Sequence, residues 1–300
     1  MTRHSFAATL FVLFCLLIAG TEPARAQATP PPQPPSDPPT ITDVTPMQDD
    51  DGALRPMEPD FSLVNLPTTL PLPVHGGNFH LTHRFNDNLV ARNTDFGDHA
   101  GILFGLDSGA NIGLEYRFGL LRHLQAVVQR TSISQTVQFS AKYDGWRQSA
   151  TLPVSISAIV SIEGDHNFGA TLHGAAKHFS PALGAVVSRT IAERVGLYAM
   201  PMWVHNTPGA AVGSRDTGIL GLGARLRVMS STYFLGEVTP RLGGYVLRDP
   251  EYGFGIEKRV GAHVFALTFT NNPGTTFRQI ALGGNPRTLN LGFNLTRKFF

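Results

Sequence analysis

Hydrophobic residues recur at every second position from about Gly76 to Phe300, and this period limits what the chain can fold into. Residues 220–228, for example, alternate Leu, Ala or Val with Gly or Arg. Because successive side chains of a strand point to opposite faces, such alternation indicates strands with one apolar and one polar face. The one stretch with some helical character is 94–106. The region 76–300 is therefore predicted to be all-β.

About fourteen segments show this alternation. They begin near residues 78, 112, 124, 136, 153, 169, 182, 195, 218, 232, 251, 262, 277 and 288. The segments near 169 and 277 alternate least well. The loops that this count leaves do not alternate regularly between short and long, which indicates that some strands are split or missed.

Composition bears on where such a sheet resides. Charged residues make up 15% of the chain, against about 25% in soluble domains. No second run of 18 apolar residues follows the N-terminus, which excludes helical spans. A transmembrane strand needs about 9–11 residues with one lipid-facing row, and many of the segments meet this length. The pattern favours one closed antiparallel transmembrane β-barrel of about 12–14 strands, while a soluble β-sandwich remains the alternative.

In a barrel the polar rows face the lumen. The candidate lumen-lining residues are Glu115, Arg117, Lys142, Arg225, Arg227, Glu237, Arg241, Glu257 and Arg259. If the lumen is open, the excess of Arg and Lys predicts a weak preference for anions. If these charges pair across strands, they close it. Two segments are candidate plugs, the loop 86–111 and the apolar segment Leu63–Leu72.

The N-terminal quarter has a different composition. Residues 1–26 read as a signal peptide, with an apolar run at 6–19 and Ala24-Arg25-Ala26 before cleavage after about Ala26. Residues 27–75 hold 13 of the 22 prolines and are expected to be an extended or disordered linker. The barrel is predicted at 76–300. The only cysteine, Cys15, lies in the signal, so the mature protein has none.

No motif predicts catalysis, a cofactor or a metal. His80 and His83 are three apart on a predicted strand and so point to opposite faces, as do His173 and His178. The run from Ser161 to Asn167 contains Ser, acids and His but reads as a hairpin loop, and no Gly-x-Ser-x-Gly elbow occurs. With 24 basic and 22 acidic residues, the charge balance argues against nucleic-acid binding.

Two stretches resemble a known family. His83-Arg84-Phe85 and the run 104–116, above all Gly-Leu-Asp-Ser-Gly-Ala-Asn at 105–111, are similar to the domain-of-unknown-function family of bacterial outer-membrane β-barrels catalogued as 5777, over roughly residues 65–300. The resemblance implies an outer-membrane location and supplies no activity. The ending Lys298-Phe299-Phe300 partly resembles the C-terminal aromatic signature of such barrels, because Phe299, rather than Phe300, continues the apolar row.

The sequence thus predicts an exported bacterial outer-membrane β-barrel that is not an enzyme. Its expected role is structural, or a narrow pore for small polar solutes. One alternative is a lipid-modifying enzyme that uses Ser161 or His166 at the rim, and another is a soluble periplasmic β-sandwich binding module. The expected partners are outer-membrane lipid and, through the C-terminal strand, the assembly machinery. The sequence names no periplasmic partner for the proline-rich linker.

Overall fold

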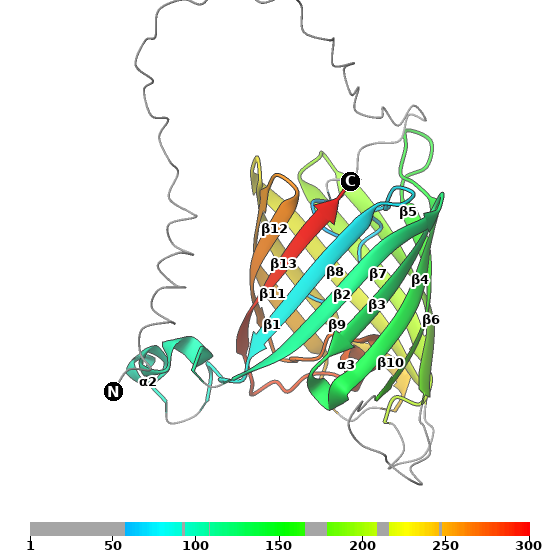
Figure 1. Ribbon diagram of the computed structural model, residues 1–300. Coiled ribbons are helices and arrows are strands. Elements are labelled where there is room, and N and C mark those ends of the chain that lie inside the picture. The colour runs from blue at the N-terminus through cyan, green and yellow to red at the C-terminus, as the bar shows by residue number, and fades with distance from the viewer. Residues whose placement is uncertain (1–57, 92–93, 108, 166–178, 209–215, 246–247) are drawn as a thin grey trace, which may run out of the picture. The chain divides into compact units, whose positions relative to one another are not determined.

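The computed structural model describes residues 58–91, 94–107, 109–165, 179–208, 216–245 and 248–300, and these form a β-barrel (Figure 1). The strands are β1 (Gly77–Phe85), β2 (Ala110–Leu121), β3 (Leu124–Thr131), β4 (Thr136–Trp146), β5 (Ser155–Asp165), β6 (Phe179–Ile191), β7 (Val195–Val204), β8 (Thr217–Met229), β9 (Thr232–Thr239), β10 (Arg241–Gly244), β11 (Glu251–Val260), β12 (His263–Thr270) and β13 (Asn290–Phe299). Strands β9 and β10 both pair with β8 and together occupy one strand position of the barrel. The barrel is therefore twelve-stranded.

The sheet closes on itself by two pairings. Strand β1 pairs with β13 in a register that runs from Gly77↔Phe299 to Arg84↔Gly292, and β9 pairs with β8 from Leu222↔Val238 to Met229↔Thr232. Every neighbouring pair in the ladder is antiparallel. Closure leaves no long unpaired edge, which is the condition for a sheet in lipid, where backbone groups have no water to bond.

The two faces of the barrel differ as the alternation predicts. On β2, Leu114 and Tyr116 are 45% and 42% exposed, whereas Arg117 on the opposite face is 5% exposed. The same outward row carries Phe254 and Ile256 on β11. The low charge of the sequence therefore belongs to the outer face, which is apolar. None of the helices within the described ranges has the length and hydropathy needed to span a bilayer.

The strand count changes at two places. The predicted strand near 277 is the helix α3 (Phe277–Leu282), whose first turn is closed by a capping box between Thr276 and Gln279. Its buried residues Phe277, Ile280 and Ala281 follow helical spacing. The predicted segment near 169 lies outside the described residues, as do residues 1–57 with the signal peptide and most of the linker.

With the helix α3 reassigned, most of the short connections lie at one end of the barrel and most of the long ones at the other. At the end that holds Gly77 and Phe299, four of the five turns are short: those between β2 and β3, β6 and β7, β8 and β9, and β11 and β12. We call this the short-turn end. The opposite, long-loop end carries the connections 86–109 and 271–289. The described part of loop 86–109 contains α2 (Phe96–Gly101) and lies outside the lumen (Figure 1).

Candidate functional site: a lumen closed by two plugs

Residues 58–72 fold inside the barrel as a hairpin, which we call the plug hairpin. The Leu63 amide donates to the Leu66 carbonyl at 2.8 Å, and Thr68 N donates to Phe61 O at 2.8 Å. Phe61, Leu63 and Leu66 are each 1% exposed. The sequence assigned these residues to the linker 27–75, but the structure buries them, because their apolar side chains find a matching apolar wall. Of the two candidate plugs, Leu63–Leu72 is the one inside the lumen.

The turn of the plug hairpin is held by one carboxylate of the barrel wall. Glu237 on β9 accepts hydrogen bonds from the backbone amides of Val64 (3.0 Å), Asn65 (2.8 Å) and Leu66 (3.1 Å). The Asn65 side chain donates to the neighbouring Glu251 at 2.9 Å. Charge-assisted bonds of this kind are about twice as strong as neutral ones, and here they satisfy amides that would otherwise be buried without partners.

Three buried cations of the wall bind backbone carbonyls of the same hairpin. The contacts are Arg84 Nη2 to Val64 O at 3.2 Å, Lys142 Nζ to Thr68 O at 2.9 Å and to Leu70 O at 2.8 Å, and Arg225 Nη2 to Ser62 O at 2.8 Å. Two of these cations also have carboxylate partners on the wall, Glu257 at 3.0 Å from Arg225 and Asp144 at 3.1 Å from Lys142. The wall therefore recognises the main chain of the hairpin from both its amide and its carbonyl sides.

The hairpin approaches the wall closely at glycines. A Cβ atom on Gly223 would lie 2.2 Å from Leu63 Cδ1, and one on Gly221 would lie 2.9 Å from Leu66 Cδ2. Glycine within a strand marks such close approach. The space that these glycines leave is filled by the leucines of the plug hairpin. Around them, Ile159, Met200 and other wall residues complete an apolar core inside the barrel.

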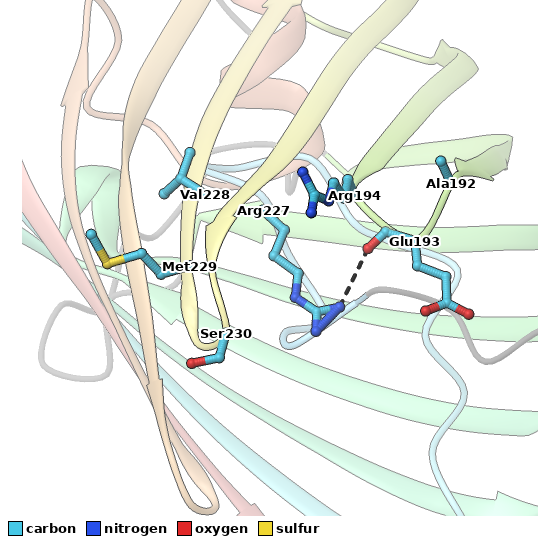
Figure 2. A pocket seen from close by; sticks show the side chains of 7 residues that line it. All are labelled: Ala192, Glu193, Arg194, Arg227, Val228, Met229 and Ser230. Atoms are coloured by element: carbon cyan, nitrogen blue, oxygen red, sulfur yellow. Dashed lines mark hydrogen bonds between the residues drawn. The ribbon is translucent and has the colours of Figure 1, made fainter.

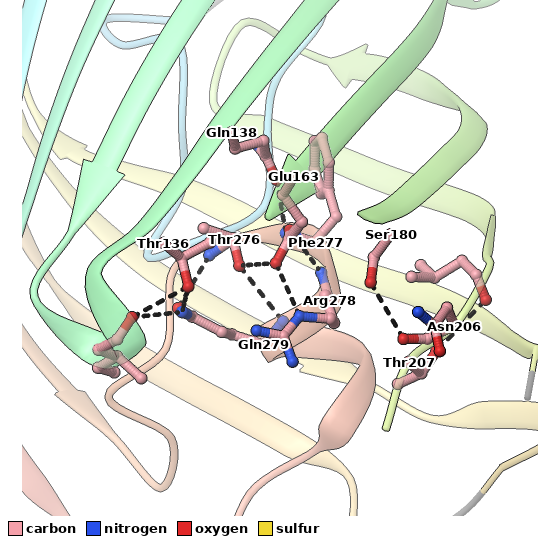
Figure 3. Close-up of polar contacts among 12 residues, drawn as sticks. Thr136, Gln138, Glu163, Ser180, Asn206, Thr207, Thr276, Phe277, Arg278 and Gln279 are labelled. Carbon is pink, nitrogen blue, oxygen red and sulfur yellow. Dashed lines mark hydrogen bonds and ion pairs between the residues drawn. The ribbon is translucent and has the colours of Figure 1, made fainter. Parts of the chain in front are cut away.

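The helix α3 packs against the inner face of the barrel wall near the long-loop end, where wall side chains bind its first turn (Figure 3). Glu163 on β5 accepts hydrogen bonds from Thr276 Oγ1 (2.9 Å), from the Arg278 amide (3.1 Å) and from Arg278 Nε (3.1 Å). The Phe277 amide donates to Gln138 Oε1 at 2.9 Å. A single wall carboxylate thus caps the first turn of α3, in the way that Glu237 caps the turn of the hairpin.

The structure separates the predicted lumen residues into two groups. Arg117, Lys142, Arg225, Glu237 and Glu257 are buried in the lumen, and Glu115 joins them through a 2.6 Å bond to Arg117 Nε. The other three lie near the rims. Arg227 and Arg259 are at the short-turn end, and Arg241 is at the long-loop end, where it donates to Asp249 O at 3.0 Å.

Besides Glu58 and Asp60 of the plug hairpin, four buried charges of the barrel wall were not among the sequence candidates: Arg84, Asp144, Glu163 and Glu251. Each lies on the polar row of its strand, so the parity that identified Lys142 would also have found Asp144. The middle of the lumen then holds Arg84, Arg117, Lys142 and Arg225 against Glu115, Asp144, Glu163, Glu237, Glu251 and Glu257. The preference for anions expected from the shorter list does not follow from this wall.

A cavity of about 390 Å³ opens at the short-turn end, between the β6–β7 turn and the β8–β9 turn (Figure 2). Its lining includes Glu193, Arg194, Arg227 and Ser230, and Arg227 Nη1 donates to the Glu193 carbonyl at 3.3 Å. The lining contains a serine but no histidine. It therefore lacks the nucleophile and base pair that the enzyme alternative needs.

Within the described part of the chain, no three His, Cys, Asp or Glu side chains gather in a way that could hold a metal. His80 is buried in the lumen, 4.0 Å from Glu115 Oε1, whereas the ring of His83 stacks on Phe293 with centroids 4.9 Å apart. Ser161 is buried. His166, His173 and His178 lie outside the described residues.

A closed antiparallel sheet with an apolar outer face and a polar interior defines an outer-membrane β-barrel protein. A family model described as a membrane bound beta barrel domain (DUF5777) matches residues 60–299. The chain belongs to this family and resides in the bacterial outer membrane. The family resemblance and the barrel of 12–14 strands predicted from the sequence are confirmed.

Among solved structures, the chain is similar to three barrels. They are an outer membrane channel from Pseudomonas putida F1 (13% identity, TM-score 0.47, 77% of this chain and 97% of that chain covered), the NanC porin (8%, 0.46, 74% and 99%) and LpxR from Salmonella typhimurium (9%, 0.35, 74% and 99%). No curated protein matches the chain. Because barrels of this class carry short turns on the periplasmic side, the short-turn end faces the periplasm.

Proposed function

We propose that the protein is a gated pore for small polar solutes and that the plug hairpin is its gate. The observation that carries this proposal is how the hairpin is held. Among the described residues, its backbone bonds only to itself and to wall side chains, never to the backbone of a barrel strand. The hairpin can therefore leave the lumen without breaking any ladder of the sheet.

Withdrawal of the hairpin would expose to water both the apolar part of the wall and its charged positions. Arg84, Lys142, Arg225 and Glu237 would exchange their peptide partners for water, as polar groups of a pore do. The helix α3 is tied to Glu163 by separate bonds and stays in place. The remaining path is narrow, which supports small solutes as the cargo. We propose no catalytic role, and we keep recognition of the C-terminal strand by the assembly machinery as a further proposal.

Planar-bilayer recording with a glycine variant tests the gate. Valine at Gly223 places side-chain atoms where Leu63 lies, so Gly223→Val should displace the hairpin and raise the frequency of conductance steps at least tenfold over the original chain. Gly236→Val is the matched control, because a Cβ there meets nothing within 4 Å. Absence of steps in both the original chain and Gly223→Val would contradict conduction and leave a structural role.

A further inference from the structure

A polar cavity of about 500 Å³ lies at the long-loop end, apart from both plugs. Its volume falls within the range of small-ligand sites, about 300–1,000 Å³. Three connections supply its walls, those between β1 and β2, between β10 and β11, and between β12 and β13. The lining residues are Asn86, Asn111, Arg248, Asp249, Asn271, Pro273, Gly284, Asn285, Pro286, Thr288 and Asn290. Five of the eleven are asparagines, so most of the polar groups that line the cavity are uncharged.

The cavity walls are fixed by hydrogen bonds among the loops. Asn271 Oδ1 accepts from Tyr252 N at 2.8 Å and its Nδ2 donates to Pro250 O at 3.0 Å. The Gly284 amide donates to Asp249 O at 2.9 Å. These bonds join the two loops that face each other across the cavity, so the site exists before any ligand arrives and a ligand spends little free energy on ordering it.

Donors at the mouth of the cavity are left for a ligand. In the part of the chain that the structure describes, the Arg248 guanidinium makes no hydrogen bond or ion pair, and the side-chain nitrogen of Asn285 has no acceptor. Both residues are exposed. The carboxylate of Asp249 and the amide oxygens provide acceptors beside these donors. One positive and one negative side chain line the cavity, so it has no net charge.

We propose that this cavity binds a neutral oligosaccharide from outside the cell. A sugar presents many hydroxyl groups, each both donor and acceptor, and the free donors of Arg248 and Asn285 beside the side-chain oxygens of Asp249 and the asparagines match this dual character. Sites built to bond hydroxyls reject analogues that lack them, because their polar groups would stay unpaired. The flat rings of Pro273 and Pro286 offer apolar surface for the C–H faces. Sugar binding at this cavity does not require conduction, so the experiments that test the gate and those that test this site can fail independently.

Titration of the full-length protein in detergent by isothermal calorimetry tests the site. The probes are three neutral trisaccharides, maltotriose, cellotriose and xylotriose, with trigalacturonate as an acidic comparison. We expect saturable binding of at least one neutral probe. Asn285→Trp fills the mouth and should abolish binding, and Arg248→Ala should weaken it about tenfold. Arg287→Trp is the matched control, an exposed residue of the same loop that does not line the cavity, and should bind as the original chain does.

Three results would overturn the proposal. One is that no neutral trisaccharide binds saturably. Another is that trigalacturonate binds and the neutral probes do not, which would assign an anionic ligand. The third is equal binding by Asn285→Trp and Arg287→Trp, which would place the sugar elsewhere. Heat-modifiable gel mobility, in which a closed barrel migrates faster unheated, shows that each variant is folded.

Discussion

A chain that lacks residues 58–72 is expected to conduct ions continuously in a planar bilayer, whereas the full chain stays closed for most of a recording. The deletion removes Leu63, Val64 and Leu66, which fill the middle of the lumen. It also frees Lys142 and Glu237, which bind the hairpin backbone. Asp144 stays 3.1 Å from Lys142 Nζ, and water replaces the hairpin backbone as the other partner of these charges, so the wetted lumen should conduct.

The control for this deletion removes a segment of the same length from the proline-rich region, residues 30–44. That variant keeps the plug hairpin and should stay closed. Faster migration of the unheated sample establishes that each deleted chain still forms a barrel. A folded barrel without residues 58–72 that shows no conductance would contradict the proposed gate, because α3 alone would then close the lumen.

Replacing Glu237 by leucine should release the plug hairpin while the sheet persists. Three amides, those of Val64, Asn65 and Leu66, lose their common acceptor. A buried donor without a partner costs about 1–3 kcal/mol, so the docked hairpin should lose about 3 kcal/mol or more. Hydrogen exchange at Phe61–Thr68, followed by mass spectrometry, should then be at least about a hundredfold faster than in the original chain.

Glu237→Gln separates the acceptor from the charge. Glutamine keeps one carbonyl oxygen at this position and can still accept from the turn, so its exchange rate should fall between those of the original chain and Glu237→Leu. Exchange at β13 should not change in either variant, because its amides pair with β1 and β12. Unaltered exchange at Phe61–Thr68 in Glu237→Leu would show that the carboxylate does not hold the hairpin.

The barrel could be predicted from sequence because strand parity is a local property. A two-residue period indicates which face of the strand each side chain occupies. This even-or-odd position along the strand was enough to place Lys142 and Glu257 in the lumen. Depth within the lumen is not local. Arg259 lies on the same row as Glu257 but next to the β11–β12 turn, so it is exposed at the rim while Glu257 is buried.

Parity did not identify either plug, because the plug hairpin has no sustained strand period and the short alternation near 277 predicted a strand instead of α3. The plug hairpin contains Pro59 and Pro67 and continues a proline-rich segment, so composition indicated a linker. Its burial depends on the wall glycines and on Glu237, which are far away in the chain. The helix α3 did carry a local signal, the capping box Thr276-x-x-Gln279, which short apolar alternation obscured.

The most direct test of the gate is a reversible covalent lock. Thr69 Oγ1 and Ser188 Oγ lie 2.6 Å apart, so Thr69→Cys/Ser188→Cys places two thiols side by side, and their oxidation should join the hairpin to β6 by a disulfide. Cys15, which lies in the predicted signal peptide, is the only cysteine of the sequence. The control Ser155→Cys/Ser188→Cys joins β5 to β6, where these residues are direct partners, and leaves the hairpin free.

The measurement is the conductance of both double variants in a planar bilayer under oxidising and then reducing conditions. We expect oxidation to abolish the conductance steps of Thr69→Cys/Ser188→Cys and reduction to restore them. The control Ser155→Cys/Ser188→Cys should conduct equally in both states. Equal conductance of the oxidised and reduced lock, with the disulfide verified by mass spectrometry, would contradict the claim that the plug hairpin is the gate.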